Sequence, residues 1–384
     1  MEVISPFKEA QQEIRQSGGE PSNFCFQCGK CDTLCPWNRV TTFSVRKLMR
    51  EASLGVVEIE KEEVWRCTTC GKCPLNCPRD VRQIENMVAL RRVATNYDVY
   101  PASVKSVRRI IACLTAQGNP FGEERSERGK WAEGLGVKEF TEGMEYLYFP
   151  CCYPCYDARL KRVARAVASL LNKAGVDFGI LGSKENCCGE SIRKTGNEEL
   201  FKQLAKEEIK IFIDNGVRKI ICSSPHCYHT FKNEYPYFGV NFQVIHITQF
   251  LLTLLEEGRL KINGSYSKVV TYHDPCYLGR HNGIYEEPRS LLKSIPGLQL
   301  VEMREIKEES LCCGMGGGRV WMETPKEERF ANLRIQQALD TGAEVLATAC
   351  PYCITAFEDA RVVLNLEDRI EVKDVTEILD EVTI

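Results

Sequence analysis

This chain of 384 residues lacks the sequence features that would indicate nucleic-acid binding, a membrane span or secretion. Its formal net charge is only −3, which argues against a basic surface for binding nucleic acid. Its longest apolar runs fall far short of the roughly 20 residues that a membrane-spanning helix needs. The first residues, MEVISPFKEAQQEIRQ, have no apolar core of the kind found in secretory signal peptides. These absences predict a cytoplasmic protein without a membrane span of its own.

The sequence also shows no signature of a flavin, nicotinamide or haem site. The glycine-rich run GMGGG at 314–318 lacks the G-x-G-x-x-G spacing of dinucleotide sites, because residue 319 is Arg. The run follows a cysteine pair, which favours a role beside a metal cluster. Without a hydride-accepting cofactor of its own, the chain is expected to exchange electrons with a partner.

Cysteine, by contrast, is abundant, with 21 residues. Disulfide frameworks are typical of small secreted chains, whereas this chain is large and groups its cysteines at short spacings. Short spacings favour metal ligation. We therefore expect thiolate-bound metal rather than structural disulfides. Cys113, in the helix-like stretch RRIIACLTA, is expected to be an ordinary core residue.

Two cysteine runs in the first third of the chain share one spacing. CFQCGKCDTLCP at 25–36 and CTTCGKCPLNCP at 67–78 both read C-x2-C-x2-C-x3-C-P, which indicates cubane [4Fe–4S] clusters. Zinc ribbons, the alternative, use two separated C-x2-C pairs and leave the extra cysteine and the C-P step unexplained. In two-cluster ferredoxins the fourth cysteine ligates the other cluster. The predicted ligand sets are Cys25, Cys28, Cys31 and Cys77 for one cluster, and Cys67, Cys70, Cys73 and Cys35 for the second.

The segments between and after these two runs have the apolar spacing of amphipathic helices. TTFSVRKLMREASLGVVEI carries such a pattern and then a Gly55 stop, and DVRQIENMVALRRVATN follows the second run. Residues 1–115 are therefore predicted to form a helical ferredoxin-like domain with two clusters. The stretch 116–144 begins with many glycines and charges and predicts a linker.

From residue 145 the sequence alternates between short apolar strands and amphipathic helices. This alternation predicts a mostly parallel sheet with helices on its faces. The plan occurs twice, because several cysteines recur about 125 residues apart. The matched positions are Cys152 with Cys276, Cys187 and Cys188 with Cys312 and Cys313, and Cys227 with Cys353. We expect two Rossmann-like α/β domains, 145–265 and 266–384, related by a pseudo-twofold axis, with cysteines just after the strand ends where ligands bind.

The second repeat offers five thiols from three strand ends. They are Cys276, Cys312, Cys313, Cys350 and Cys353. A tetrahedral zinc ion takes only four ligands, whereas soft thiolates suit iron–sulfur chemistry. The adjacent Cys312 and Cys313 cannot easily chelate one iron, but they can hold neighbouring irons of one cluster. The glycines that follow would let the backbone pass close to that cluster and donate N–H groups to its sulfurs.

This pattern resembles the CCG cysteine-rich domain, which occurs twice in the B subunit of heterodisulfide reductase. The C subunit of that family is a small helical ferredoxin, and the D subunit looks like a fusion of the C and B subunits. The present chain has that order over roughly residues 20–365. The resemblance implies a noncubane [4Fe–4S] cluster on the five cysteines of the second repeat, which would be its catalytic centre for cleaving a disulfide. It also implies a redox partner similar to the family's flavoprotein or to a cytochrome b, the latter holding the chain at a membrane.

The first repeat departs from the family pattern. Ser224 stands where Cys350 stands in the second repeat, and serine is a poor iron ligand. Cys222 lies two residues earlier. At the other end, FPCCYPC offers Cys151, Cys152 and Cys155, of which the family pattern points to Cys152. Three alternatives follow: a noncubane cluster with Cys222 substituting, no cluster at all, or a four-thiolate cluster on Cys152, Cys187, Cys188 and Cys227.

Three functions fit these features. The first is a thiol–disulfide oxidoreductase of the heterodisulfide reductase type. The second is a non-catalytic electron-transfer subunit of a larger flavin-based complex, such as an electron-bifurcating or acyl-CoA oxidoreductase, and the incomplete first repeat favours it. The third is the iron–sulfur partner of a flavin-dependent 2-hydroxy-acid dehydrogenase. His226, His229 and His273 lie near cysteines and are expected to pack or to orient ligands, although one could protonate a thiolate.

Overall fold

The computed structural model describes residues 5–20 and 24–384, and the chain folds into two compact units. The first unit contains the described residues up to Ile111 and two later segments, Ser191–Phe201 and Gly314–Phe330. The second unit contains Ala112–Glu190, Lys202–Cys313 and Ala331–Ile384. Each later segment of the first unit begins shortly after one of the cysteine pairs. The α/β part of the sequence therefore contributes directly to the helical unit.

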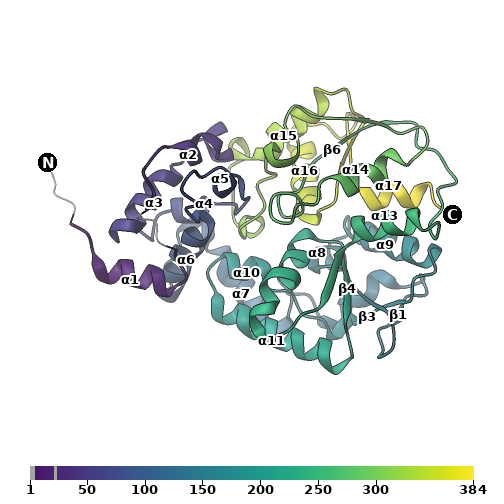
Figure 1. Ribbon diagram of the computed structural model, residues 1–384, viewed down its shortest axis with the longest axis horizontal. Helices are drawn as coiled ribbons and strands as arrows, with labels where there is room; N and C mark the ends of the chain where they lie inside the picture. The colour runs from purple at the N-terminus through teal and green to yellow at the C-terminus, as the bar shows by residue number, and fades with distance from the viewer. Residues whose placement is uncertain (1–4, 21–23) are drawn as a thin grey trace. The chain divides into compact units, whose positions relative to one another are not determined.

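The first unit is helical, as predicted. Its main helices are α1 (Lys8–Gln16), α2 (Lys30–Leu34), α3 (Val45–Leu54), α4 (Glu63–Arg66), α5 (Lys72–Leu75), α6 (Gln83–Asn96) and the start of α7 (Ser106–Gln117), as Figure 1 shows. Helix α3 shows why they form: the Ser44 side chain accepts the Lys47 N–H at its start, and Gly55 ends it with φ 72°. One apolar cluster joins Trp65 and Leu90 to Met322 from the last segment.

The second unit holds two parallel sheets (Figure 1). The first has the order β1-β3-β2-β4-β5, and the second has the order β7-β6-β8-β9. The strands are β1 (Lys138–Glu139), β2 (Tyr146–Phe149), β3 (Phe178–Ile180), β4 (Lys219–Cys222), β5 (Gln243–His246), β6 (Val269–Tyr272), β7 (Gln299–Val301), β8 (Val345–Thr348) and β9 (Glu371–Asp374). Leaving β1 aside, both sheets arrange their strands as second, first, third and fourth in chain order. The two α/β stretches therefore share one topology, and a pseudo-twofold relation between them stays a prediction.

Helices connect these strands. They are α8 (Cys152–Tyr156), α9 (Lys161–Lys173), α10 (Glu190–Lys194), α11 (Glu198–Asp214), α12 (Pro225–His229), α13 (Ile247–Glu256), α14 (Glu286–Lys293), α15 (Phe330–Leu339), α16 (Pro351–Val363) and α17 (Val375–Glu381). Phe149 at the end of β2 pairs with Cys222 at the end of β4, and Tyr272 of β6 pairs with Ala347 of β8. Because paired parallel strands end at the same edge, the loops that follow them meet there. Cys151, Cys276 and Cys350 lie on these loops, and the cysteine pairs 187–188 and 312–313 lie on the loops that follow β3 and β7.

The stretch 116–144, for which the sequence predicts a linker, carries structure. A 3-10 helix runs over Arg125–Ala132, and β1 pairs with β3. Trp131 is buried with its ring 5.7 Å from that of Tyr148 in β2. Arg128 is also buried. These residues therefore form part of the first α/β repeat.

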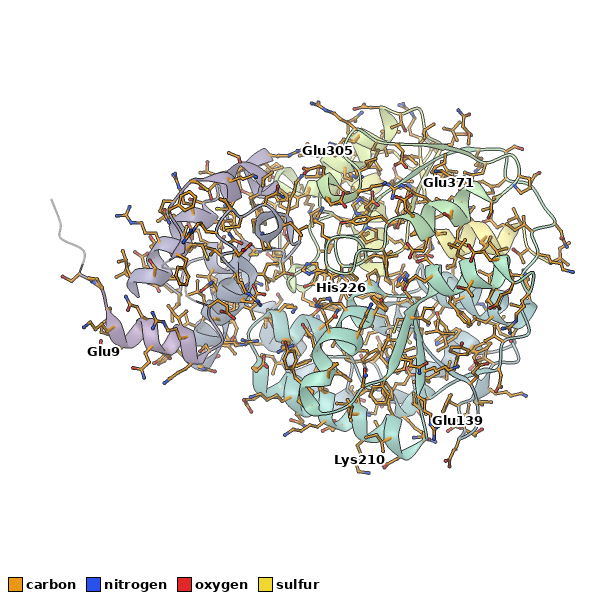
Figure 2. The ribbon with its side chains drawn as sticks, viewed as in Figure 1. Glu9, Glu139, Lys210, His226, Glu305 and Glu371 are labelled. Atoms are coloured by element: carbon orange, nitrogen blue, oxygen red, sulfur yellow. The ribbon has the colours of Figure 1, made fainter. Side chains whose placement is uncertain are left out.

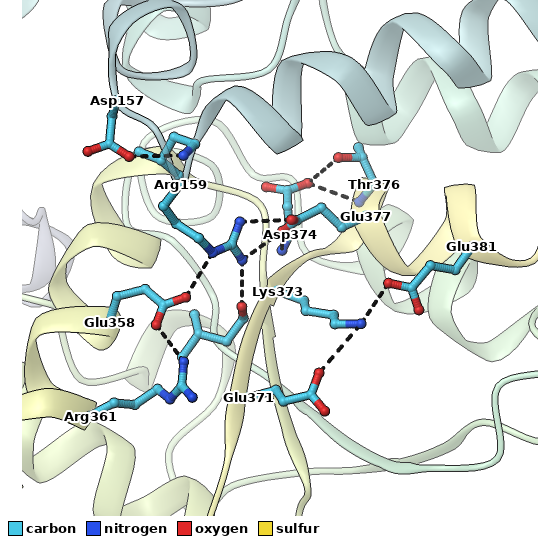
Figure 3. A network of polar contacts seen from close by, with 12 residues as sticks. Asp157, Arg159, Glu358, Arg361, Glu371, Lys373, Asp374, Thr376, Glu377 and Glu381 are labelled. Atoms are coloured by element: carbon cyan, nitrogen blue, oxygen red, sulfur yellow. Dashed lines mark hydrogen bonds and ion pairs between the residues drawn. The ribbon is translucent and has the colours of Figure 1, made fainter. Parts of the chain in front are cut away.

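The two α/β repeats are joined by a network of charged side chains, which Figure 3 shows from close by. Arg159, at the start of the first repeat, contacts Glu358 at 2.9 Å and Glu377 at 2.7 Å, and donates to the Val372 carbonyl. Charge-assisted bonds of this kind add geometric specificity as well as energy. Arg159 thus fixes α16, α17 and β9 of the second repeat against the first.

In the described chain, no helix has the length and apolar character needed to cross a membrane.

Candidate iron–sulfur sites

The four cysteines predicted for the second cubane cluster lie around one cavity. Its walls include Cys35, Cys67, Cys70 and Cys73, together with apolar side chains such as Phe43 and Met87. Burial and the neighbouring thiols of Cys67 and Cys70 raise the pKa of Cys73 well above its usual value. Burial and Cys70 likewise raise the pKa of Cys35. Cys35 therefore lies with the three cysteines of the other run, the exchange that the motif predicts.

The two ferredoxin runs have the same local backbone shape. Gln27 and Thr69, each two residues after the first cysteine of its run, have φ angles of 61° and 52°, and a left-handed glycine follows each second cysteine. The Thr69 N–H donates to Cys67 Sγ at 3.4 Å, and the Gln27 side chain donates to Cys25 Sγ at 3.3 Å. These tight turns direct N–H groups at the sulfurs.

The cysteines predicted for the other cubane cluster are less enclosed. Cys28 is exposed, whereas Cys25, Cys31 and Cys77 are half-buried. Burial, Asp32 and Cys25 raise the pKa of Cys31 to about 12, so Cys25 and Cys31 lie near each other. The assignment of Cys77 to this set stays a prediction.

In the second repeat, the five predicted thiols are brought together and all are buried. Cys313 and Cys353 have their sulfurs 3.4 Å apart, Cys276 contacts Cys312, and Cys350 contacts Cys353. Cys350 precedes α16, which begins at Pro351. Burial raises the pKa of the Cys350 thiol, but hydrogen bonds from Cys353 and His226 outweigh burial and lower it to about 5.

His273 completes the surroundings of this thiol set. Its ring, Cys313 and Cys353 place possible ligand atoms within 4.8 Å of one another. Arg334 donates to His273 Nδ1 at 3.1 Å. Burial and Arg334 hold the pKa of His273 well below its usual value, so the ring is neutral. The bond from Arg334 fixes how this imidazole faces the thiols.

His226 belongs to the first repeat but contacts the thiols of the second. It hydrogen-bonds Cys350, stacks on Tyr277 and packs at a tilt against Tyr352, with ring centroids 4.1 and 4.4 Å away. Figure 2 labels it within the second unit. Its Nδ1 lies 3.2 Å from a Glu190 carboxylate oxygen. Burial lowers its pKa, but Glu190 and Cys350 outweigh burial and raise it to about 10.

The sequence predicted that His226 packs or orients a ligand, but nothing local in PHCYH indicates that the partner is a cysteine about 120 residues later. Its position next to Cys227 was the available signal. The histidine lies between a cysteine of the first thiol set and a cysteine of the second. It therefore links the two sets, because it adjoins Cys227 in the sequence and hydrogen-bonds Cys350.

The first repeat also gathers its paired cysteines. The sulfurs of Cys188 and Cys227 are 3.4 Å apart, Cys152 contacts Cys187, and Cys151 contacts Cys227. Cys222 is fully buried at the end of β4. The sequence-predicted Cys152, Cys187, Cys188 and Cys227 thus lie together, and the role of Cys222 stays a prediction.

A buried arginine borders this thiol set. Arg128 donates to Cys152 Sγ at 3.4 Å and to Glu185 at 3.0 Å. Burial raises the pKa of Glu208 well above its usual value, which leaves this carboxyl neutral beside the Asn186 backbone N–H. Arg128 therefore places a positive charge where thiolates gather. Sequence reasoning missed it because it lies in a stretch rich in glycine and charge.

The glycine run after Cys313 approaches a different partner from the one expected. A Cβ on Gly316 would lie 2.4 Å from the Thr68 carbonyl oxygen, and one on Gly317 would lie 2.5 Å from that of Cys67. Arg91 donates to the carbonyls of Gly317 and Cys67 at 2.8 and 2.6 Å. These two glycines thus allow close packing against the loop that carries the second ferredoxin run.

The donor chemistry fits iron–sulfur clusters. All 21 cysteines lie in the described chain and are free thiols. Four of them surround the cavity of Cys35, and others meet at the strand ends of the two repeats. Thiolate-only sets with N–H donors to sulfur suit such clusters. Cys113, expected in the core, is only half-buried.

Two family models match the chain. The cysteine-rich domain matches residues 146–232 and 270–358, and the 4Fe-4S dicluster domain matches residues 21–81. Both α/β repeats therefore match the same domain, which confirms the repeat. The domains also follow one another in the predicted order.

Curated relatives extend the likeness. Over 330 residues the chain is 41% identical to the probable iron-sulfur-binding oxidoreductase FadF of Bacillus subtilis, covering 84% of this chain and 46% of that protein. It is 37% identical to the EtfAB:quinone oxidoreductase of Syntrophomonas wolfei, covering 86% and 48%. The chain thus spans about half the length of these two relatives. It is 32% identical to the D subunit of the dihydromethanophenazine:CoB--CoM heterodisulfide reductase of Methanosarcina acetivorans, covering 91% of each.

A solved structure shares the fold. A crystal structure of a hypothetical protein from Helicobacter pylori superposes with a TM-score of 0.55 at 12% identity. The match covers 98% of this chain and 72% of the other. At this identity the likeness concerns the fold alone.

Proposed function

Because this chain belongs to the family of the heterodisulfide reductase D subunit, we propose that it relays single electrons within a larger redox complex. It is an iron–sulfur oxidoreductase subunit that joins a 4Fe-4S dicluster domain to two cysteine-rich domains. In the proposed relay, electrons from a flavoprotein partner enter the dicluster domain and continue to the cysteine-rich domains.

The observation that carries the proposal is the contact of His226 with Cys350. A residue adjacent to Cys227 of the first repeat hydrogen-bonds a thiol of the second. The two buried thiol sets are therefore neighbours rather than isolated sites. Neighbouring buried redox groups suit electron passage from one to the next.

When bound, iron–sulfur clusters supply one-electron transfer at potentials set by net charge, hydrogen bonds to sulfur and solvent exposure. The residues of this chain act on each of these quantities. The Thr69 N–H donates to Cys67 Sγ, and Arg128 holds a positive charge against Cys152. The thiols gathered in the two repeats are buried, apart from the half-buried Cys187, and their burial keeps water away.

The identity of the donor is inferred from the relatives and from the sequence. One relative is named an EtfAB:quinone oxidoreductase, and the present chain has no flavin signature of its own. We therefore assign the role of donor to an electron-transferring flavoprotein. The cubane cluster on Cys25, Cys28, Cys31 and Cys77 would receive the electron, because Cys28 is exposed.

A second candidate function is disulfide reduction at the second repeat. The five thiols of that repeat are complete, and the matches to two relatives named as the heterodisulfide reductase D subunit cover 91% or more of their length. In this case a disulfide substrate would be cleaved beside Cys350, where His226 is a hydrogen-bond donor.

The test uses the full chain, loaded with iron and sulfide under anaerobic conditions. It is mixed with a reduced electron-transferring flavoprotein, and flavin absorbance is followed by stopped flow while freeze-quenched samples report reduced clusters. We expect flavin reoxidation together with new cluster signals, slowed in Cys70→Ser, which removes a predicted ligand of the second cubane cluster. A fully loaded chain that leaves the flavin reduced would contradict the relay. Thiol release from an added mixed disulfide, without a response to flavoprotein, would favour the second candidate.

A further inference from the structure

Cys151 has a backbone conformation that is unusual for its residue type. Its φ is 79° and its ψ is 158°, a region occupied almost only by glycine. A residue that carries a side chain is strained there. The position corresponds to Pro275 in the second repeat, because Cys152 corresponds to Cys276. The first repeat therefore has a strained cysteine where the second has an ordinary proline.

The thiol of this residue points into the cluster site. The Cys151 thiol accepts a hydrogen bond from the Cys227 thiol and lies near Ser224. Ser224 is the residue that stands in place of Cys350. A thiol that follows the end of β2 therefore lies beside the position from which the thiol of Cys350 is missing in the first repeat.

The contacts of the two repeats then correspond pair by pair. In the second repeat, Cys350 contacts Cys353, whose sulfur lies 3.4 Å from that of Cys313. In the first repeat, Cys151 contacts Cys227, whose sulfur lies 3.4 Å from that of Cys188.

The remaining pair agrees as well. Cys152 contacts Cys187 in the first repeat, as Cys276 contacts Cys312 in the second. Each repeat therefore presents five thiols with the same pattern of sulfur contacts, although the sequence spacing of the first is incomplete.

Cys222, the substitute suggested by sequence spacing, lies elsewhere. It is the last residue of β4, fully buried, and paired in the sheet with Phe149 and His246. Within the described chain its sulfur makes no hydrogen bond of the kind that joins Cys151 to Cys227. Its position inside the sheet fits an ordinary core cysteine.

We infer that Cys151 supplies the thiolate that Ser224 cannot, so that the first cysteine-rich domain binds its own iron–sulfur cluster. The ligand set is Cys151, Cys152, Cys187, Cys188 and Cys227. This inference rests on the proposed iron–sulfur function and adds the ligand set of one site. It also gives a reason for the strain, because glycine at position 151 would relax the backbone but remove the thiol.

The test compares the full chain with three variants, all loaded with 57Fe and sulfide under anaerobic conditions. Cys151→Gly removes the thiol and relieves the strain, Cys222→Ala removes the rival thiol, and Cys151→Gly/Ser224→Cys restores a thiol at position 224. Mössbauer and EPR spectra report the cluster types, and iron analysis reports their number. The spectra of the cubane clusters and of the second-repeat cluster in the same samples show that the chain is folded.

We expect Cys151→Gly to lose one cluster, about a quarter of the iron if four [4Fe–4S] clusters are present, or to convert it to another spectral type. The double variant should recover the original spectrum, and Cys222→Ala should keep it. An unchanged spectrum in Cys151→Gly, or the same loss in Cys222→Ala, overturns the inference. These readouts need no flavoprotein, so a failure of the proposed electron relay would leave this result intact.

Discussion

Replacing His226 with phenylalanine should lower the reduction potential of the cluster that we propose on the second repeat. The imidazole donates a hydrogen bond to Cys350 and packs against Tyr277 and Tyr352. Phenylalanine keeps an aromatic ring at this position but has no donor. A hydrogen bond to a ligand sulfur stabilises the reduced, more negative cluster, so its loss makes reduction harder.

The size of the shift follows from the strength of one hydrogen bond. Because the pKa values of His226 and Cys350 make this a bond between charged groups, its contribution is about 1.5–3 kcal/mol, which at 59 mV per tenfold change for one electron corresponds to roughly 65–130 mV. Glu190 lies 3.2 Å from the imidazole and would remain in the variant. Its charge would add to the negative shift, so His226→Phe/Glu190→Gln isolates the hydrogen bond.

The assay is an anaerobic redox titration followed by EPR. The control is His229→Phe, because His229 lies on the same helix and contacts Tyr277 and His281 instead of Cys350. We expect a shift toward negative potential for one signal in the His226 variants and a smaller one in the control. A positive shift, or equal shifts in the His229 control, would refute the reasoning.

The helical unit supports two further predictions, measured by denaturant unfolding of the full chain. Gly342 is the control position, because it lies outside that unit, has a φ of 75° and has nothing within 4 Å of an added Cβ. Alanine there should lower the free energy of unfolding by about 1 kcal/mol through backbone strain alone. At Gly317, alanine would also meet the Cys67 carbonyl oxygen at 2.5 Å, so it should lower the free energy of unfolding by about 1–3 kcal/mol more than alanine at Gly342 does. Equal losses at the two positions would contradict close packing at Gly317. Arg91→Met removes a buried guanidinium that donates to four backbone carbonyls. We expect the free energy of unfolding to fall by about 3–5 kcal/mol. A fall below about 1 kcal/mol would show that water replaces those bonds.

The cysteine spacing predicted a large part of the candidate site. The C-x2-C-x2-C-x3-C-P runs placed Cys35 with the other run, and the repeat placed Cys312 and Cys313 with Cys353. The proximity of these cysteines can be predicted because a motif encodes a local loop and parallel strands bring their ends to one edge, whereas the ligand assignments stay predictions. The repeat also predicted two similar α/β domains, and the two sheets have the same strand order once β1 is left aside.

The features that the sequence did not reveal depend on distant contacts. In the sequence, Cys151 is simply the residue before Cys152. Its φ angle and its contact with Cys227, which only the structure shows, indicate a different role. Gly317 meets Cys67 across about 250 residues of sequence, a separation that no local pattern encodes. Arg128 lies in a stretch whose composition is typical of a surface loop, yet its side chain is buried against Cys152.

The contribution of Gly314–Phe330 to the helical unit has a consequence for how the protein matures on the ribosome. The apolar cluster around Trp65 includes Met322, and Arg91 bonds the Gly317 carbonyl. A nascent chain that has emerged only as far as Ile111 therefore cannot complete that cluster. At about 5–20 residues per second, the missing segment follows roughly 10–45 seconds later. Loading of iron into the N-terminal domain should accordingly be completed late in synthesis, and a fragment cut after the second cysteine run should hold its clusters poorly.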